Sequence, residues 1–122
     1  MMKLLVVDDS ELIRSRLVGW LQSVPGMPEI DTAGTLKQTL ECVQHGHPEL
    51  LILDLHLPDG NALQILPTLR EMAPDMQIAV LTNDASNFNR GKCLKAGADW
   101  FFDKSTEFEK VLDLIQQQVL IH

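Results

Sequence analysis

The chain has 122 residues, of which 45% are hydrophobic and 22% are charged, so it fits one compact domain with a buried core. Its formal net charge of −7 argues against direct nucleic-acid binding, which needs Lys and Arg to neutralise phosphates, and against an acidic membrane surface. No apolar run approaches the roughly 20 residues of a membrane-spanning helix, and two isolated cysteines without metal-site spacing indicate a reducing cytosol.

Short apolar runs alternate with helical patterns along the chain. The five runs that we predict to be strands are residues 4–7, 30–33, 50–53, 78–81 and 100–102. Residues 30–33 are the weaker candidate, and the other runs are almost continuously apolar, which is typical of strands that helices cover on both faces. Strands separated by helices indicate an α/β domain of the (βα)5 type, with a parallel sheet and right-handed crossovers. We find no linker or second domain.

The first two helical patterns each follow a capping residue. Ser10 and Thr35 are expected to accept hydrogen bonds from the first turn of the helix that follows, and Gln38 makes the second start resemble a capping box. The stripes expected to face the core are Ile13, Leu17, Leu21 and Val24 in the first helix and Leu36, Leu40 and Val43 in the second.

The later helical patterns are less regular. Pro67 lies inside the third one, which predicts a kink or a late helix start. The fourth, residues 88–96, is polar and weak, and Gly97 fits a left-handed position that ends it. Thr106 is predicted to start the last helix, whose apolar face excludes Leu114. The apolar face consists of Phe108, Val111, Leu112, Ile115 and Val119.

Polar side chains follow four of the five apolar runs. They are Asp8 and Asp9 after the first run, Asp54 after the third, Thr82 after the fourth and Lys104 shortly after the fifth. The carboxyl ends of parallel strands share one edge of a sheet, where ligands bind in this class of fold. Three neighbouring carboxylates need a cation or a proton, and their oxygens suit Mg²⁺. With a hydroxyl and an ammonium group beside them, they suit phosphoryl transfer to a carboxylate.

The motifs VVDDS, LDLHLPDG, AVLTND and KAGADWFFDKS occur in this order, and the chain resembles a response-regulator receiver domain of two-component signalling. The resemblance covers nearly the whole chain. It implies a doubly wound, flavodoxin-like fold, with helices on both faces of a five-stranded parallel sheet of strand order 2-1-3-4-5. It also implies a single cytoplasmic signalling domain that is not an enzyme on external substrates and catalyses only its own phosphorylation and dephosphorylation.

The resemblance assigns the acceptor and the metal ligands. Asp54 matches the residue that accepts a phosphoryl group from a sensor histidine kinase or a phosphotransfer protein. Asp9 matches a direct ligand of Mg²⁺ or Mn²⁺, and Asp8 matches the acid that helps through water. Asp54 itself and the backbone carbonyl of His56 complete the implied ligands.

The resemblance also assigns a switch. Thr82 matches the hydroxyl that turns toward the phosphoryl group, Lys104 the ammonium that pairs with it, and Phe101 the aromatic ring that changes rotamer on activation. The fourth helix, the fifth strand and the last helix then form the implied output face. That face would control an output domain or a downstream partner, and it is a candidate for homodimer formation.

Four residues depart from the family's usual pattern or occupy its variable positions. Asn83 follows Thr82 where a smaller residue is usual, and Ser105 follows Lys104 where proline is frequent. His56 and Asp84 each lie two residues beyond a site residue, and positions of this kind tune the lifetime of the phosphate. We therefore expect His56, Asn83 and Asp84 to set the kinetics.

Three other functions fit parts of the sequence. An interaction module with the same fold would lack the chemistry, but the complete set of site residues argues against it. A hydrolase with an aspartyl-phosphate intermediate typically has an acid two residues after its nucleophile, where this chain has His56. A flavin-binding domain would need a phosphate-binding loop rich in Ser, Thr or Gly after the first strand, and none follows it.

Overall fold

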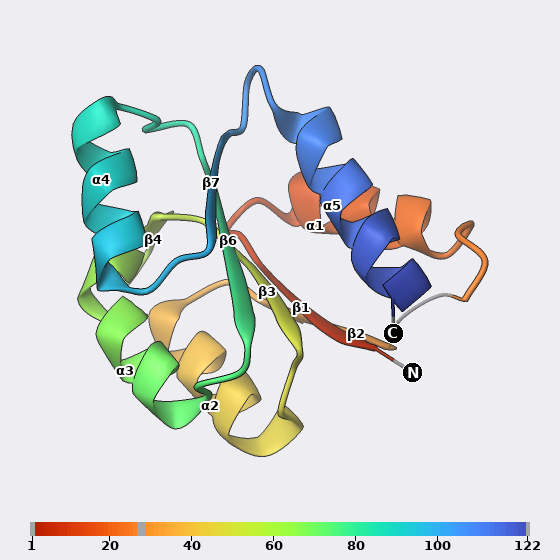
Figure 1. The fold of residues 1–122 in the computed structure, drawn as a ribbon, viewed down its shortest axis with the longest axis horizontal. Helices are drawn as coiled ribbons and strands as arrows, with labels where there is room; N and C mark the ends of the chain where they lie inside the picture. Colours follow the sequence, from red (N-terminus) through yellow and green to blue (C-terminus); the bar gives the residue numbers. More distant parts are fainter. Residues whose placement is uncertain (1, 27–28, 122) are drawn as a thin grey trace.

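The computed structural model describes residues 2–26 and 29–121. A twisted sheet lies between two layers of helices (Figure 1). The strands of this sheet are β1 (Lys3–Val7), β2 (Glu29–Ala33), β3 (Leu50–Leu53), β6 (Gln77–Thr82) and β7 (Trp100–Asp103). The helices are α1 (Glu11–Leu21), α2 (Leu36–Gly46), α3 (Leu66–Met72), α4 (Asn87–Ala96) and α5 (Phe108–Ile121).

The sheet is parallel throughout, and its strands follow the order β2-β1-β3-β6-β7. This order is 2-1-3-4-5 for the five predicted strands, so the expected doubly wound fold is confirmed. Val7 pairs with Leu53, and Leu53 pairs with Val80. Because β1 and β3 end side by side, the polar residues that follow them start at the same edge of the sheet.

Two apolar cores lie on opposite faces of the sheet. Leu5 and Leu51 belong to the core under α2, α3 and α4, whereas Leu4 and Leu50 belong to the core under α1 and α5 (Figure 1). Successive side chains of a strand point to opposite faces, so a strand covered on both sides needs apolar residues at every position. This requirement explains the continuous apolar runs of the sequence.

The first two helices begin as predicted. Ser10 Oγ accepts a hydrogen bond from the Ile13 amide at 3.3 Å, and Thr35 Oγ1 accepts one from the Gln38 amide at 3.1 Å. The Gln38 side chain accepts from the Gly34 amide rather than from that of Thr35, so the second half of the capping box is displaced by one residue. Helix α1 ends at Leu21, and the prediction that Val24 continues its stripe is therefore wrong.

The third and last helices begin late. A short 3₁₀ turn, η1 (Ala62–Gln64), precedes α3, which confirms the late start predicted from Pro67. Helix α5 begins at Phe108, so the start predicted at Thr106 is wrong. Glu107 explains the delay, because its amide donates to the Asp103 carbonyl and its carboxylate accepts from the Asp103 amide. Leu114 is 8% exposed and belongs to the core, contrary to the predicted stripe.

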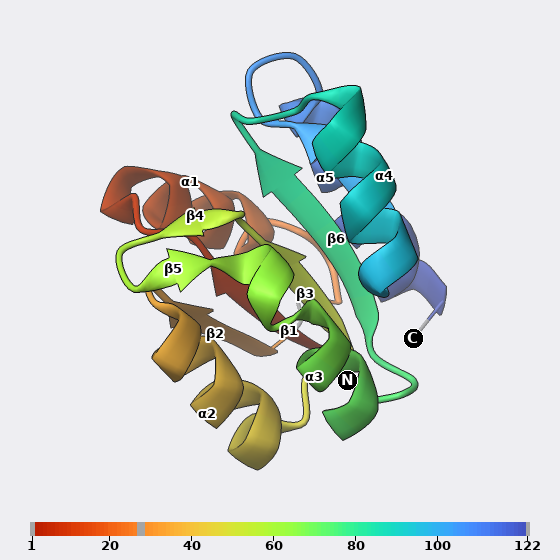
Figure 2. The same cartoon turned by 90° about the vertical axis from the view of Figure 1, so that its left-hand side faces the viewer.

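A small antiparallel hairpin, β4 (His56–Leu57) with β5 (Gly60–Asn61), was not predicted (Figure 2). Asp59 in its turn accepts hydrogen bonds from the amides of Leu36 and Lys37, at 2.7 and 3.1 Å. Its carboxylate thus satisfies two amides at the start of α2, which have no partner within the helix. This contact fixes the hairpin on α2 and with it the position of His56.

Replacing Asp59 with alanine is expected to lower the melting temperature at neutral pH, because the two amides lose their acceptor. The hydrogen bond from the Leu36 amide, with a weaker one from Lys37, lowers the pKa of the Asp59 carboxyl. Its stabilising contribution is therefore complete above the unfolded pKa of about 3.9 and is lost as the pH falls through the folded value. Thermal unfolding should show the difference between the two proteins shrinking in acid.

The matched control for this experiment is Asp75→Ala, which removes an exposed carboxylate from the loop before β6. It should leave the melting temperature almost unchanged at both pH values. An Asp59→Ala protein that melts like the wild type at neutral pH would contradict the capping role.

Among the described residues, every helix is too short or too polar to span a bilayer.

Candidate functional site

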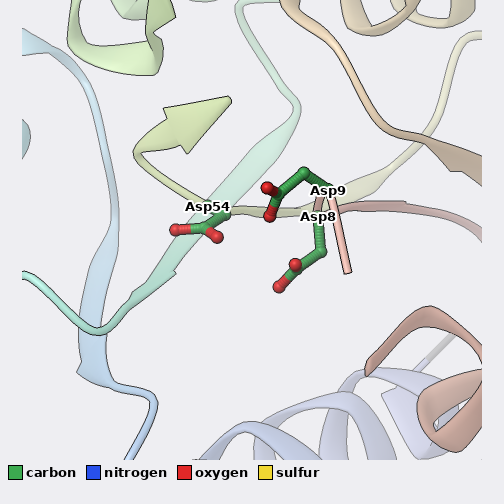
Figure 3. Close-up of side chains that lie close together, drawn as sticks. All are labelled: Asp8, Asp9 and Asp54. Carbon is green, nitrogen blue, oxygen red and sulfur yellow. The ribbon is translucent and has the colours of Figure 1, made fainter. Parts of the chain in front are cut away.

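The three predicted carboxylates meet at the carboxyl edge of the sheet (Figure 3). The Asp8 amide donates to the Ala33 carbonyl at 3.1 Å, and the Asp54 amide donates to the Val7 carbonyl at 3.0 Å. These bonds continue the strand pairing one residue past β1 and β3, so the two carboxylates are positioned by the sheet itself. Asp8 and Asp54 are 2% and 6% exposed, whereas Asp9 is exposed to solvent.

Lys104 joins this group from the end of β7. Its amide donates to the Thr82 carbonyl at 2.9 Å, which continues the pairing between β6 and β7. Its Nζ atom lies 2.7 Å from Asp8 Oδ2 and 2.8 Å from Asp54 Oδ2. All three of these side chains are nearly buried, so the ammonium group offsets part of the repulsion between the two carboxylates.

The charges of this buried group depend on one another. Burial raises the pKa of the Asp8 carboxyl, although hydrogen bonds from Lys104 and from the Ser10 amide act in the opposite direction. Burial alone would lower the pKa of Lys104, but its hydrogen bonds to Asp54 and Asp8 outweigh this effect and raise it. Lys104 therefore stays charged at neutral pH, while the surroundings of Asp8 still disfavour a full negative charge.

The acidic cluster of Asp8, Asp9 and Asp54 could hold a metal ion. One carboxylate oxygen from each residue lies within 4.8 Å of the other two. A set of carboxylate oxygens fits a hard divalent cation such as Mg²⁺, Mn²⁺ or Ca²⁺. Arg14 also approaches this region, where its guanidinium donates to the backbone carbonyl of Asp8. The sequence did not predict this contact.

A hollow of about 420 Å³ opens above the acids. Its lining consists of Asp8, Asp9, Ser10, Ile13, Asp54, His56, Thr82, Asn83 and Lys104. Seven of these residues were predicted site residues, whereas the predicted Asp84 and Phe101 do not line the hollow. Asn83 is part of this lining and is exposed to solvent.

Of the two predicted switch residues, Thr82 lines the hollow and Phe101 is not part of its lining. Thr82 is fully buried, and its Oγ1 atom accepts a hydrogen bond from the Asp84 amide at 3.1 Å. Phe101 is 2% exposed and packs in the core under α2, α3 and α4. The Arg90 guanidinium carbon lies 5.0 Å from the centre of the Phe101 ring, and Arg90 Nη1 donates to the Phe101 carbonyl at 3.1 Å. Phe101 therefore contacts α4, and Thr82 contacts the loop before it.

His56, which lines the hollow, contacts Asp84, with His56 Nε2 2.7 Å from Asp84 Oδ2. The hydrogen bond from His56 lowers the pKa of the Asp84 carboxyl. Our sequence interpretation named both residues but not their contact. A signal was present, because each lies two residues beyond a predicted site residue, Asp54 or Thr82, and the strands β3 and β6 that carry these residues are neighbours in the sheet.

The model of the response regulator receiver domain family matches residues 4–116 of the chain. The chain belongs to this family. It is therefore a signalling domain of two-component systems, in agreement with the fold and with the arrangement of its site.

The chain is 31% identical over 104 residues to the DNA-binding transcriptional activator DevR/DosR of Mycobacterium tuberculosis, covering 85% of this chain and 48% of that protein. The chain spans about half the length of the curated relatives that it matches first. It is 27% identical, with a TM-score of 0.85, to a response regulator protein from Burkholderia pseudomallei that carries a phosphorylated aspartic acid, a calcium ion and citrate. This match covers 98% of the present chain and 69% of the other.

A second solved structure is the beryllofluoride-activated receiver domain dimer of NtrC4. It is 30% identical to the chain, with a TM-score of 0.84, and the match covers 98% of this chain and 96% of that one. The first of these proteins thus carries a phosphorylated aspartic acid and a calcium ion, and the second is a dimer of receiver domains.

Proposed function

We propose that the chain is a phosphate-accepting receiver domain in which Asp54 takes a phosphoryl group from the phosphohistidine of a sensor histidine kinase or a phosphotransfer protein. The observation that carries this proposal is the position of Asp54, which lies in the hollow, beside Lys104 Nζ and within the acidic cluster. The phosphorylated aspartic acid of the Burkholderia pseudomallei relative supports the same chemistry.

In the proposed reaction, a carboxylate oxygen of Asp54 attacks phosphorus, and the bond from phosphorus to the donor's histidine nitrogen breaks. The phosphoryl group becomes an acyl phosphate, and the histidine leaves with its electron pair. Mg²⁺ or Mn²⁺, held by Asp8, Asp9, Asp54 and the His56 carbonyl, would neutralise charge on the phosphoryl oxygens. Lys104 already touches Asp54, so its ammonium group can pair with a phosphoryl oxygen after the transfer.

The output would pass through Thr82 to the face formed by α4, β7 and α5. The added negative charge recruits the Thr82 hydroxyl and Lys104, and the loop before α4 moves with them. This face exposes Phe88 and Leu94 on α4, at 68% and 43%. It would contact an output domain, a downstream partner or a second copy of the chain, while the chain itself would act in the cytoplasm without binding nucleic acid.

The direct test is incubation with acetyl phosphate and Mg²⁺, followed by mass spectrometry of the intact protein. The wild type should gain one base-labile phosphoryl group, and Asp54→Asn should gain none because its amide is a poor nucleophile. Asp75→Asn, which changes the charge equally at the opposite edge of the sheet, should behave like the wild type. Phosphate uptake by Asp54→Asn would place the acceptor elsewhere, and no uptake by the wild type, even from kinases, would favour an interaction module.

A further inference from the structure

Asp84 connects three separate parts of the site. Its carboxylate accepts from His56 in the hairpin at 2.7 Å, and its amide donates to the Thr82 hydroxyl at 3.1 Å. Its carbonyl accepts from Asn89 Nδ2, in the first turn of α4, at 3.0 Å. A single residue therefore joins the loop of the acceptor, the switch hydroxyl and the helix of the proposed output face.

The opposite end of α4 is fixed by a different contact. Arg70 on α3 donates through Nη2 to the Gly97 carbonyl at 2.6 Å and to Asp99 Oδ2 at 3.0 Å, and through Nη1 to the Met76 carbonyl. These bonds hold the end of α4 against α3 and the start of β6. The contacts of Asp84 therefore lie at the end of α4 that Arg70 does not hold, where Arg90 also donates to the Phe101 carbonyl.

The contact between Thr82 and Asp84 opposes the turn of the switch. Thr82 Oγ1 accepts from the Asp84 amide in this conformation, and its side chain is fully buried. Rotation of the hydroxyl toward a phosphoryl group on Asp54 moves Oγ1 away from that amide. The amide cannot follow freely, because the side chain of the same residue is bonded to His56 and its carbonyl is bonded to Asn89.

We propose that the His56–Asp84 bridge is a latch that holds the loop of residues 83–86 in the unphosphorylated position and must open before Thr82 can turn. This proposal rests on the proposed function, because it concerns the regulation of the same site. His56 and Asp84 are positioning residues in this mechanism. They act on Thr82 and α4 through the bridge.

A latch and a purely electrostatic effect predict different binding affinities for the two single variants. A contact that is made only in the unphosphorylated state lowers the affinity for any ligand that binds the activated state. Removing either His56 or Asp84 breaks this contact and should therefore raise the affinity. An effect of charge alone would act through the Asp84 carboxylate, which repels an anion, and would not make His56→Ala bind an anion more tightly. The two single substitutions therefore separate the two explanations.

Beryllofluoride in the presence of Mg²⁺ is a suitable probe, because it mimics a phosphoryl group on a carboxylate without a chemical step. Calorimetric titration should show that His56→Ala and Asp84→Ala each bind it about two- to fivefold more tightly than the wild type, as expected for an exposed hydrogen bond to a carboxylate. The double variant should bind no more tightly than the tighter single variant, since both changes remove the same contact. Asp75→Asn is the charge-matched control and should bind like the wild type.

Hydrogen exchange of the protein without ligand provides a second measurement that does not depend on the phosphoryl chemistry. Both single variants should exchange the amides of Asp84 and Asn89 faster than the wild type, while amides of the Arg70-bound end of α4 should stay unchanged. Weaker beryllofluoride binding by His56→Ala, additive effects in the double variant or unchanged exchange would each overturn the latch. A wild type that takes up neither acetyl phosphate nor beryllofluoride would overturn the proposed function, and hydrogen exchange would still decide whether the latch exists.

Discussion

Replacing Lys104 with methionine is expected to lower the free energy of unfolding of the metal-free protein by about 3 kcal/mol at neutral pH, the range for breaking a buried ion pair from one side. Methionine keeps most of the side-chain volume but leaves Asp8 and Asp54 buried together without a cation. Mg²⁺ should restore much of this loss, because a cation among the acids binds the folded state only. The measurement is urea unfolding with and without Mg²⁺.

The pH dependence of this variant has a definite sign. The folded pKa of Lys104 is raised, so its contribution to stability is fully present below the unfolded value of about 10.4 and is lost as the pH rises through the folded value. The difference between the wild type and Lys104→Met should therefore shrink in strong alkali, and it should also shrink in acid, because protonation of Asp8, whose pKa is raised, removes a charge that the ammonium group compensates. Lys95→Met, on the exposed face of α4, should unfold like the wild type at each pH. Equal stability of Lys104→Met and the wild type without Mg²⁺ would show that the two acids do not need the ammonium group.

The strand ends explain why so much of the site could be predicted from the sequence. Each continuous apolar run marks a strand buried on both faces, and the residue after it must lie at the carboxyl edge of a parallel sheet. Asp54, Thr82 and Lys104 were placed by this rule, and no distant contact was needed to find them. The pairing of Val7 with Leu53 then places Asp8 beside Asp54.

The contacts of Asp59, His56 and Asp84 could not be obtained in this way, because they join loops whose paths depend on tertiary packing. Asp59 resembles an ordinary turn residue in the motif Leu57–Gly60, yet its partners are amides of a helix that begins 23 residues earlier. The start of α5 was missed for a related reason. Thr106 has the preferred chemistry of a cap, but the bonds between Glu107 and Asp103 extend the turn past it.

Lys104 compensates part of the negative charge of Asp8 and Asp54, whereas Asp9 adds a further negative charge to the cluster. The ammonium group occupies the protected side of the cluster, where Asp8 and Asp54 are buried, and Asp9 stays at the solvent side. A cation that arrives from solvent would meet Asp9 first and complete the neutralisation that Lys104 begins. Loss of Asp9 should therefore affect cation binding far more than it affects the unliganded fold.

Replacing Asp9 with asparagine is expected to weaken Mg²⁺ binding roughly 10- to 100-fold, the usual cost of disturbing a metal site. Asparagine keeps the shape and one oxygen but removes one of the three negative charges within 4.8 Å of each other. Asp9 is exposed, and the bonds from Lys104 go to Asp8 and Asp54. The metal-free variant should therefore unfold like the wild type. Thermal unfolding over a series of Mg²⁺ concentrations measures the affinity through the rise in melting temperature.

The same variant links the metal to the chemistry. Uptake of phosphate from acetyl phosphate should need a correspondingly higher Mg²⁺ concentration in Asp9→Asn, and EDTA should abolish it in the wild type and in the Asp75→Asn control. If only the affinity for Mg²⁺ is changed, saturating Mg²⁺ should recover most of the wild-type rate, since Asp54 and Lys104 are intact. An unchanged Mg²⁺ dependence in Asp9→Asn would exclude Asp9 from the metal site, whereas a rate that stays low at saturation would mean that Asp9 also orients the group being transferred.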